Sequence, residues 1–169
     1  MTSTPFPFSL RSETPDQIFM LEALKQAWEA YQQGEVPVGA VLVLEGKIIA
    51  RGFNQVEMLS DATAHAEMIC LTAGASAVGD WRLLKTTLYC TLEPCAMCAG
   101  AMFLSRIEKL VYGAPDKRHG ANGSWVDLFA DNHPIHRIEL VRGVYAEPSA
   151  ELLRRFFSER RKEEEDSAE

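Results

Sequence analysis

Apolar residues along this chain recur at two spacings, and the changes between them mark the expected elements. From Thr14 to Gly34 they recur every three or four positions, which predicts a helix. Thr14 and Gln17 form a capping-box pattern at its start, and Gly34 marks its end. Two β-rich runs at 38–44 and 47–53, separated by a Glu-Gly turn, then predict a hairpin.

Beyond the hairpin, helical and extended patterns alternate. They predict helices at 64–77, 94–105 and 148–162, strands at 86–92, 109–112 and 135–144, a glycine-rich loop at 113–124 and a helical turn at 125–129. This order predicts an α/β fold, with three α/β/α layers around a five-stranded mixed sheet. The later strands are parallel because helices cross over between them. The helix N-termini that follow such strands gather at one edge of the sheet, where α/β folds bind ligands.

Composition limits where the chain works. Its 169 residues fit one domain at 14–162, preceded by a flexible N-terminal segment at 1–13 and followed by an acidic tail at 163–169. No apolar run approaches about 18 residues, so no membrane span is expected. The first residues lack a signal-peptide pattern, and the four cysteines do not read as a disulfide framework, which favours a reducing, cytoplasmic location.

Charge is unevenly distributed. A net charge of -7 argues mildly against nucleic acid as a partner, but basic residues gather locally. The glycine-rich loop carries Lys117, Arg118 and His119, and the last predicted helix carries Arg154, Arg155, Arg160, Arg161 and Lys162. We expect Phe156 and Phe157 to anchor that helix through burial. Some of its basic residues, Arg160, Arg161 and Lys162 among them, are then expected to face outward, toward phosphate.

Two short motifs carry the chemistry. Cys95 and Cys98 are three residues apart, so both sulfurs reach one point from a helix, with Pro94 expected at its first position. A helix N-terminus favours the thiolate, which is the form that binds metal. His65 can supply a third ligand if it lies at a helix start. Three ligands leave a fourth zinc position for water, and Glu67 then remains as a carboxylate that can move protons.

Other interpretations of these residues stay open at this point. Cys90 extends the pair to Cys-x4-Cys-x2-Cys, the opening of an iron–sulfur pattern, but no fourth cysteine follows, and Cys90 also reads as a buried strand residue. Cys70 lies upstream, on a different face of its helix from His65. A non-catalytic, structural zinc site is disfavoured because such sites use four protein ligands and need no spare carboxylate. Asn54 is either a turn residue or an amide directed at a base.

The combination of His-x-Glu with Pro-Cys-x-x-Cys is the signature of zinc nucleobase deaminases. The chain also carries the stretches EVPVGAVLV at 35–43, GFN at 52–54, TAHAEM at 63–68 and TLEPCAMCAGAM at 91–102. With these motifs it resembles the bacterial tRNA-specific adenosine deaminases of the cytidine-deaminase-like superfamily, from about Ile18 to Arg161.

The resemblance implies an activity and roles for individual residues. The activity is conversion of adenosine to inosine at wobble position 34 of an arginine tRNA with anticodon ACG, by a homodimer with one Zn²⁺ per subunit. The helix at 94–105 and the loop after it are then expected near the dimer interface. Zinc binding falls to His65, Cys95 and Cys98, and proton transfer to Glu67. Asn54 is expected to contact the base and Asp116 to lie near the anticodon loop, and Ala66, Val38 and Glu93 are further expected substrate-binding residues. The alternative is a zinc deaminase of a small free base or nucleotide, such as guanine or cytosine.

Two departures from the family pattern leave residues without a role. Pro115 stands before Asp116 where relatives often have arginine. The stretch Asn-His-Pro-Ile-His-Arg at 132–137 offers two histidines where many relatives have one. The roles of Asn132, His133 and His136 are therefore open.

Overall fold

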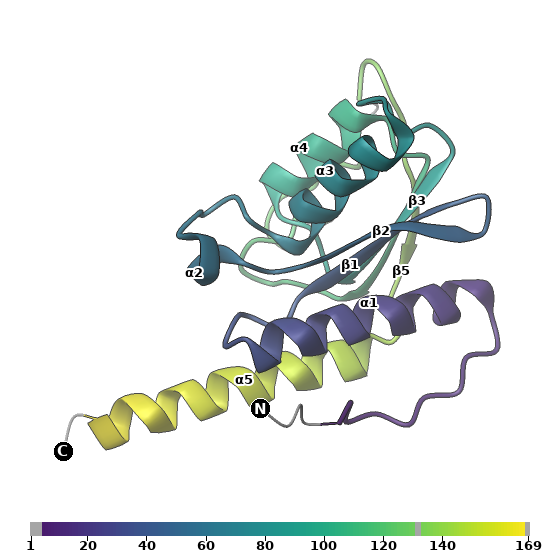
Figure 1. Cartoon of the computed structure of the whole chain (residues 1–169). Helices are drawn as coiled ribbons and strands as arrows, with labels where there is room; N and C mark the ends of the chain where they lie inside the picture. The colour runs from purple at the N-terminus through teal and green to yellow at the C-terminus, as the bar shows by residue number, and fades with distance from the viewer. Residues whose placement is uncertain (1–4, 131–132, 168–169) are drawn as a thin grey trace.

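A five-stranded sheet lies between two layers of helices (Figure 1). The computed structural model describes residues 5–130 and 133–167. Its elements are α1 (Pro15–Gln32), β1 (Gly39–Leu44), β2 (Lys47–Phe53), α2 (Val56–Leu59), α3 (Ala66–Val78), β3 (Thr86–Leu92), α4 (Ala96–Ser105), β4 (Lys109–Ala114), β5 (Glu139–Arg142) and α5 (Ala146–Ser167).

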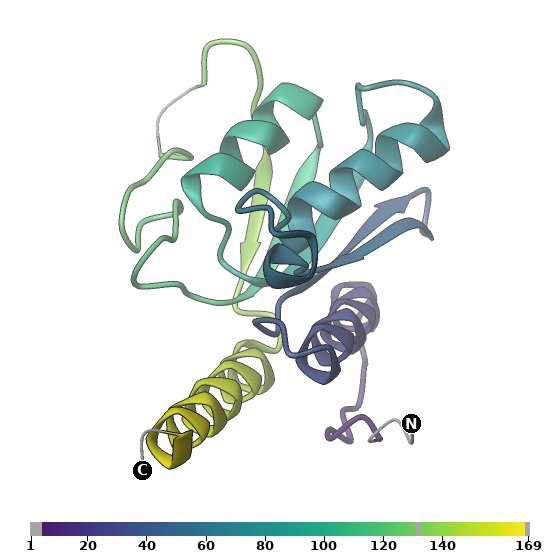
Figure 2. The ribbon, with the colours of Figure 1, turned by 60° about the vertical axis from the view of Figure 1, so that its left-hand side comes forward.

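The sheet has the order β2-β1-β3-β4-β5. Strand β1 is antiparallel to both β2 and β3, whereas β3, β4 and β5 are parallel to one another. Helices α3 and α4 cover one face, and α1 and α5 cover the other (Figures 1 and 2). The predicted three-layer fold with a mixed sheet is confirmed.

The core has a part on each side of the sheet. The larger cluster lies under α3 and α4 and contains Leu42, Leu88 and Met102, all fully buried. On the other side, Leu24 and Trp28 of α1 pack with Leu152 of α5. The N-terminal segment adds Phe6, Phe8 and Leu10 to this second cluster, and its expected flexibility stays a prediction.

Two glycines let helices lie directly on strands. A Cβ on Gly39 would come within 2.2 Å of the carbonyl oxygen of Ala23 in α1. A Cβ on Gly52 would come within 2.5 Å of the carbonyl oxygen of Ala66 and 2.8 Å of the amide nitrogen of Cys70, both in α3. These are backbone atoms that cannot turn aside, so only glycine allows this packing. The second contact sets the height of the N-terminus of α3 above β2.

Helix starts differ from prediction in a way that matters for the site. Helix α3 begins at Ala66 with His65 as its N-cap, two residues later than the predicted start at 64. Helix α4 begins at Ala96 with Cys95 as its N-cap, so Pro94 stands outside the helix rather than at its first position.

Other boundaries also needed correction. The expected helical turn at 125–129 is absent, because this stretch consists of bends around one β-bridge residue, Asp127. The last strand spans only Glu139–Arg142 instead of 135–144. Helix α5 runs on to Ser167, so residues 163–167 of the expected tail are helical and exposed. The short helix α2 was not predicted. Within the described ranges, no helix is long and apolar enough to cross a membrane.

Candidate active site

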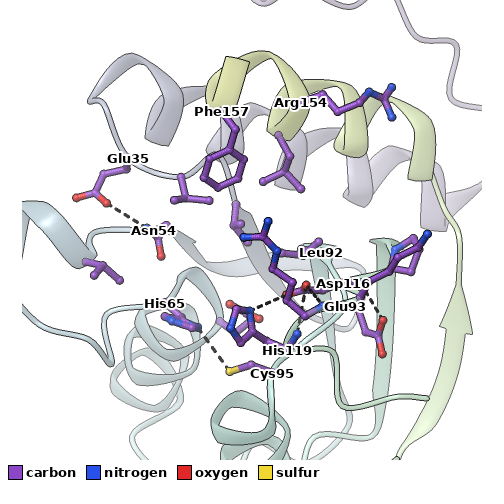
Figure 3. A pocket seen from close by; sticks show the side chains of 18 of the residues that line it. Glu35, Asn54, His65, Leu92, Glu93, Cys95, Asp116, His119, Arg154 and Phe157 are labelled. Carbon is purple, nitrogen blue, oxygen red and sulfur yellow. Dashed lines mark hydrogen bonds and ion pairs between the residues drawn. The ribbon is translucent and has the colours of Figure 1, made fainter. Parts of the chain in front are cut away.

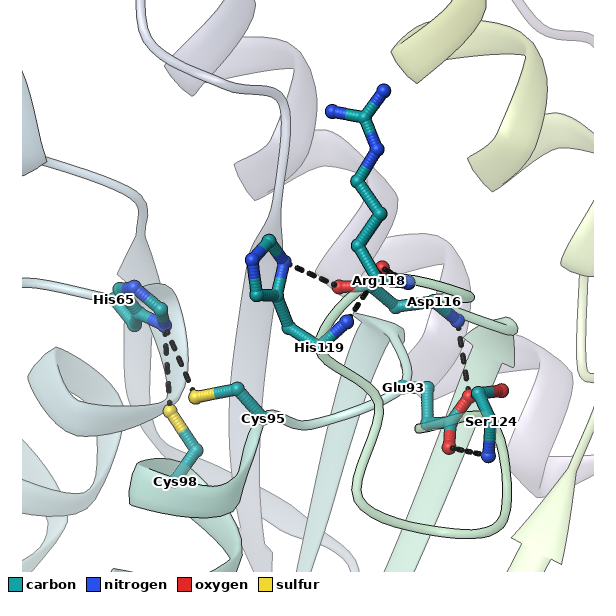
Figure 4. Close-up of polar contacts among 8 residues, drawn as sticks. All are labelled: His65, Glu93, Cys95, Cys98, Asp116, Arg118, His119 and Ser124. Atoms are coloured by element: carbon teal, nitrogen blue, oxygen red, sulfur yellow. Dashed lines mark hydrogen bonds and ion pairs between the residues drawn. The ribbon is translucent and has the colours of Figure 1, made fainter. Parts of the chain in front are cut away.

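The N-termini of α3 and α4 bring an imidazole and two thiols together (Figure 4). His65 and Cys95 are the N-caps of these helices, and Cys98 lies one turn into α4. The Nδ1 atom of His65 is 3.6 Å from the Sγ atoms of both Cys95 and Cys98. All three ligand atoms lie within 4.8 Å of one another. The predicted convergence of these three side chains is confirmed.

This spacing fits tetrahedral zinc. Zinc–sulfur and zinc–nitrogen bonds of about 2.3 and about 2.1 Å in a tetrahedral arrangement hold sulfur and nitrogen roughly 3.6 Å apart. Both His65-to-cysteine distances have this value. In the described residues, no fourth histidine, cysteine or carboxylate joins the group, so one coordination position is left for a water.

The two thiols share their protons unequally. The pKa of Cys95 is lowered to about 4, chiefly because the Cys98 thiol donates a hydrogen bond to it. The pKa of Cys98 is raised for the same reason and by burial. One thiolate therefore forms readily, and it raises the pKa of His65, its hydrogen-bond partner. A divalent cation at this point favours loss of the second thiol proton as well.

Glu67 lies beside this group in the first turn of α3 and is 3% exposed. Burial raises its pKa to about 7, and its own backbone N–H partly offsets the effect. A carboxyl group with such a pKa can both take up and release a proton near neutral pH. Glu67 thus has the environment expected of a proton carrier.

The site opens into a cavity of about 1010 Å³ (Figure 3). His65, Glu67 and Cys95 form one part of its lining. The other parts come from the segment between α1 and β1, from the residues after β2, from the loop after β4, and from α5. Such a volume lies at the upper end of the roughly 300–1,000 Å³ typical of pockets for drug-sized ligands.

Among the residues expected to contact substrate, Val38 and Asn54 line this cavity. Both are nearly buried. The backbone N–H of Asn54 donates to the backbone carbonyl oxygen of Val38 over 3.0 Å. Ala66 is fully buried in the first turn of α3, and its side chain does not line the cavity. Its expected contact with substrate stays a prediction.

Glu93 is 2% exposed, and its carboxylate holds the loop that follows β4 (Figure 4). One oxygen accepts the backbone N–H groups of Asn122 and Ser124, and the other accepts the N–H of Asp116 and the hydroxyl of Ser124. A Cβ on Gly120 would lie 2.4 Å from the Glu93 carboxyl carbon, so the loop fits tightly around it. The carboxylate of Glu93 is therefore occupied by the protein itself.

The same loop is joined to the zinc-binding turn. Gly120 and Cys95 form an isolated β-bridge, and the N–H of Ala121 donates to the carbonyl oxygen of Pro94 over 2.8 Å. Asp116 lies at the cavity, where one carboxylate oxygen accepts the backbone N–H of Arg118 and the other lies 3.6 Å from the His119 ring. The loop thus carries acidic and basic side chains to the rim of the pocket.

Helix α5 supplies the outer wall. Arg154 and Phe157 line the cavity from this helix (Figure 3), and so does Arg161, one turn further along the same face. Phe156 is buried as expected, but Phe157 is 43% exposed, so the prediction that both rings anchor the helix was wrong. Position 157 faces the pocket because it is one residue, or about 100°, away from the buried face.

Arg160 was also expected to face outward, toward phosphate, and it is exposed, but its guanidinium is engaged by the protein. Its guanidinium donates to the carbonyl oxygen of Gly34 over 2.6 Å and stacks over the Phe156 ring. It therefore fastens α5 to the end of α1. Arg161 and Lys162 are exposed, as predicted.

The other cysteines and histidines considered in the sequence analysis lie outside the site. Cys70 and Cys90 are fully buried and apart from the metal-binding group, which disfavours an iron–sulfur cluster. The His133 ring stacks on Phe103, and the Nε2 atom of His136 donates to the carbonyl oxygen of Ile107 over 2.6 Å. Neither histidine lines the cavity. Asn132 lies outside the described residues.

The sequence interpretation missed Glu35, which lines the cavity and is 1% exposed. A signal was present, since Glu35 is an acidic residue directly between a helix-ending glycine and an apolar strand. A charge at such a boundary is buried only when it has partners.

Comparisons with known proteins agree with this chemistry. Residues 13–114 match the family described as the cytidine and deoxycytidylate deaminase zinc-binding region. A tRNA-specific adenosine deaminase of Bacillus subtilis is 48% identical over 88% of this chain and 92% of its own length. One of Haemophilus influenzae is 48% identical over 91% of this chain and 89% of its own. A chloroplastic tRNA(adenine(34)) deaminase of Arabidopsis thaliana is 51% identical over 85% of this chain, which spans only 12% of that longer protein.

Solved structures give the same result. A structure from a study of A-to-I editing by tRNA:A34 deaminases superposes with a TM-score of 0.77 at 44% identity, covering 80% of this chain and 99% of that one. A guanine deaminase from Bacillus subtilis superposes less well, with a TM-score of 0.56 at 37% identity over 59% of this chain and 64% of its own.

Proposed function

Because this chain belongs to the family of zinc-dependent, tRNA-specific adenosine deaminases, we propose that it converts adenosine to inosine at the wobble position, 34, of a tRNA. The favoured substrate is an arginine tRNA with anticodon ACG. The observation that carries this proposal is the joining of the His65, Cys95 and Cys98 group to a cavity much larger than one base, with a basic and aromatic wall on α5.

Metal binding, proton transfer and substrate contact are assigned to different residues of the site. His65, Cys95 and Cys98 hold zinc, which lowers the pKa of a bound water toward about 7 when present. Glu67 would take one proton from the attacking water and pass it to N1 of the adenine ring, and would then take the proton of the new C6 hydroxyl and pass it to the departing amino group, which leaves as ammonia. Its buried position and its pKa of about 7 support both directions of transfer. Asn54 and Val38 flank the base, and Asp116 contacts the anticodon loop.

The size and charge of the pocket favour a nucleotide within RNA over a free base. Anticodon-loop bases are single-stranded and can be unstacked at low cost. Phe157 offers an exposed ring for stacking and Arg161 offers positive charge for phosphate, whereas the guanidinium of Arg154 is paired with Glu147. The similarity to guanine deaminase keeps a small free base as the second candidate substrate.

Three finer features belong to the same proposal. Each subunit binds one zinc ion, since the described residues contain a single group of this kind. The protein is a homodimer that uses α4 and the residues after it, where Leu104, Trp125 and Ile135 are exposed. It works in the cytoplasm, although one relative is named as chloroplastic.

The direct test is product analysis with the purified, zinc-loaded protein. An anticodon stem-loop with adenosine at position 34 is incubated with enzyme and digested to nucleosides, and inosine is measured by mass spectrometry. Free adenine, guanine and cytosine are assayed in parallel. We expect inosine from the stem-loop and negligible turnover of the free bases. Efficient turnover of a free base with no inosine in RNA would establish the second candidate instead.

The basic residues of α5 allow a second experiment, which separates tRNA from a small free base as the substrate. Arg161→Ala is expected to weaken stem-loop binding and to lower the slope of log affinity against log salt by about 0.7, the value for one contact with a single strand. Lys47→Ala is the control, because it removes one exposed positive charge from the β1–β2 hairpin. A deaminase of small bases predicts unchanged turnover in both variants.

A further inference from the structure

The buried carboxylate of Glu35 is set in place by the way α1 ends. Gly34 has φ +77°, and its N–H donates to the carbonyl oxygen of Tyr31 over 3.1 Å. The N–H of Glu35 donates to the carbonyl oxygen of Ala30 over 2.9 Å. These two bonds form a Schellman motif, which reverses the chain sharply at the helix end. The reversal brings Glu35 to the wall of the active-site cavity.

The carboxylate of Glu35 is fully engaged with the protein. One oxygen accepts the side-chain N–H of Asn54 over 3.0 Å and the backbone N–H of Glu57 over 3.3 Å. The other accepts the backbone N–H of Met58 over 2.6 Å. With an exposed fraction of 1%, these three donors replace the water that the carboxylate loses on folding. Both oxygens of Glu35 are therefore held by the protein, and the residue acts on the site through its partners.

The partner that matters for catalysis is the Asn54 amide. A carboxylate only accepts hydrogen bonds, so it fixes which end of the amide faces it. The Asn54 nitrogen lies toward Glu35 and the amide oxygen is directed away from it (Figure 3). The backbone of Asn54 is also held, by its bond to Val38. One N–H is used by Glu35, which leaves the amide oxygen and the second N–H for a ligand.

We propose that Glu35 is a positioning residue for the deamination reaction, which orients the Asn54 amide so that its oxygen and one N–H meet the target nucleotide in a fixed arrangement. This inference rests on the proposed function, because it assigns Asn54 to the substrate. A rotated amide would exchange donor and acceptor, and a polar group left without its partner in a buried site discriminates strongly against the substrate.

A purely structural role for Glu35 makes a different prediction. Two of its three hydrogen bonds go to the backbone of α2, so it also fixes that turn. If this were its whole contribution, removing it would harm the enzyme independently of Asn54. The two roles are therefore separated by the coupling between the two residues, not by the effect of one substitution.

The experiment is a double-mutant cycle with Glu35→Gln, Asn54→Ala and the double variant, all zinc-loaded. The steady-state constants kcat and KM are measured on whichever substrate the wild type turns over. We expect each single variant to lose about 10- to 100-fold in kcat/KM, and the double variant to lose no more than Asn54→Ala alone. A loss in the double variant equal to the product of the two single losses would overturn the proposal. Glu45→Gln, a loss of one exposed carboxylate in the hairpin turn, is the charge control.

A second measurement needs neither activity nor a folded Glu35 variant. The side-chain NH₂ resonances of Asn54 are assigned in the wild type by their absence in Asn54→Ala. We expect one of the two protons to be protected from exchange with water, because it lies against the buried carboxylate. Equal and rapid exchange of both protons would contradict the proposal, even if the protein turned out not to act on tRNA. Conversely, a protected proton in a protein without RNA activity would refute only the proposed function.

Discussion

At the scale of single residues, Glu67 is the group whose environment departs most usefully from that of an ordinary surface side chain. It is buried in the first turn of α3 beside two thiols and an imidazole, yet it is not needed as a fourth ligand. Coordination and proton transfer are therefore assigned to different side chains. This separation makes each of them testable alone.

Glu67→Ala is expected to keep zinc and fold while kcat falls by at least about 10²–10⁴-fold, the usual size of a general acid–base contribution. The measurements are inosine formation, metal content and the thermal unfolding midpoint. The wild-type midpoint and one zinc per chain serve as the reference. A variant that has lost its zinc would mean that the carboxylate is a ligand.

The raised pKa of Glu67 also makes stability depend on pH. An ordinary glutamate has a pKa of 4.5, and here burial raises it to about 7. Folded protein therefore holds the proton more tightly than unfolded protein, so the stability contributed by the neutral form is complete below 4.5 and is lost as pH rises through about 7. The difference between the two pKa values corresponds to about 3 kcal/mol.

In zinc-free protein, Glu67→Gln is accordingly expected to be more stable than the wild type at pH 8 by up to about 3 kcal/mol, and equal to it near pH 4. Denaturant unfolding at both pH values measures this. Zinc should reduce the difference, since a cation favours the ionised carboxylate. A difference that does not change with pH would show that Glu67 is not buried as a titrating group.

Residue identities and their chemistry could be predicted from the sequence, whereas their directions could not. The zinc ligands follow from a spacing that permits one geometry. The directions of the Phe157 and Arg160 side chains do not follow from their spacing, because a shift of one residue on a helix turns a side chain by about 100°. Glu93 was expected to meet substrate, and it does line the cavity, but its carboxylate also holds a loop whose path no local pattern reveals.

At the scale of elements, the site depends on how closely α3 lies against β2. Gly52 allows this contact, and His65 immediately precedes the first residue of α3. Periodicity predicted α3 but placed its start at Ala64, two residues early. The N-cap is fixed here by tertiary packing and a metal-binding side chain, since His65 makes no capping hydrogen bond.

Gly52→Ala is expected to push α3 away from the sheet, which lowers the unfolding free energy by about 1–3 kcal/mol and weakens zinc binding, because His65 moves with the helix. A competing chelator measures the zinc affinity. Gly39→Ala is the matched control: its Cβ meets α1 on the opposite face of the sheet, so stability falls while zinc affinity stays. Equal zinc affinity in both variants would show that zinc binding does not depend on the contact between α3 and β2 at Gly52.

At the scale of the whole molecule, the layered fold leaves large apolar side chains uncovered at and after the end of α4. Leu104 is 64% exposed and Ile135 is 66% exposed. The expectation of a dimer came from resemblance and from the small residues of α4, and Gly100 has nothing within 4 Å of where a Cβ would stand. Sequence alone cannot show which face of a helix its own subunit leaves free.

Leu104→Glu is therefore expected to convert a homodimer into monomers at micromolar concentration, because a buried, unpaired charge at an interface is strongly unfavourable. Light scattering gives the molecular mass. Ile18→Glu is the control, since Ile18 is 50% exposed on α1, in the opposite helical layer. A wild-type protein that is already monomeric at this concentration would refute the dimer.

The pairing of α1 with α5 also has a consequence for how the chain is made. Leu24 and Trp28 near the beginning are covered by Leu152 near the end, and Arg160 fastens α5 to Gly34. About 110 residues separate the two helices. A ribosome that adds about 5–20 residues per second needs roughly 6 to 23 seconds for this interval. During synthesis Leu24 and Trp28 of α1 thus stay uncovered until α5 has been made. The residues of α5 are also the last of those that line the active-site cavity to be synthesised.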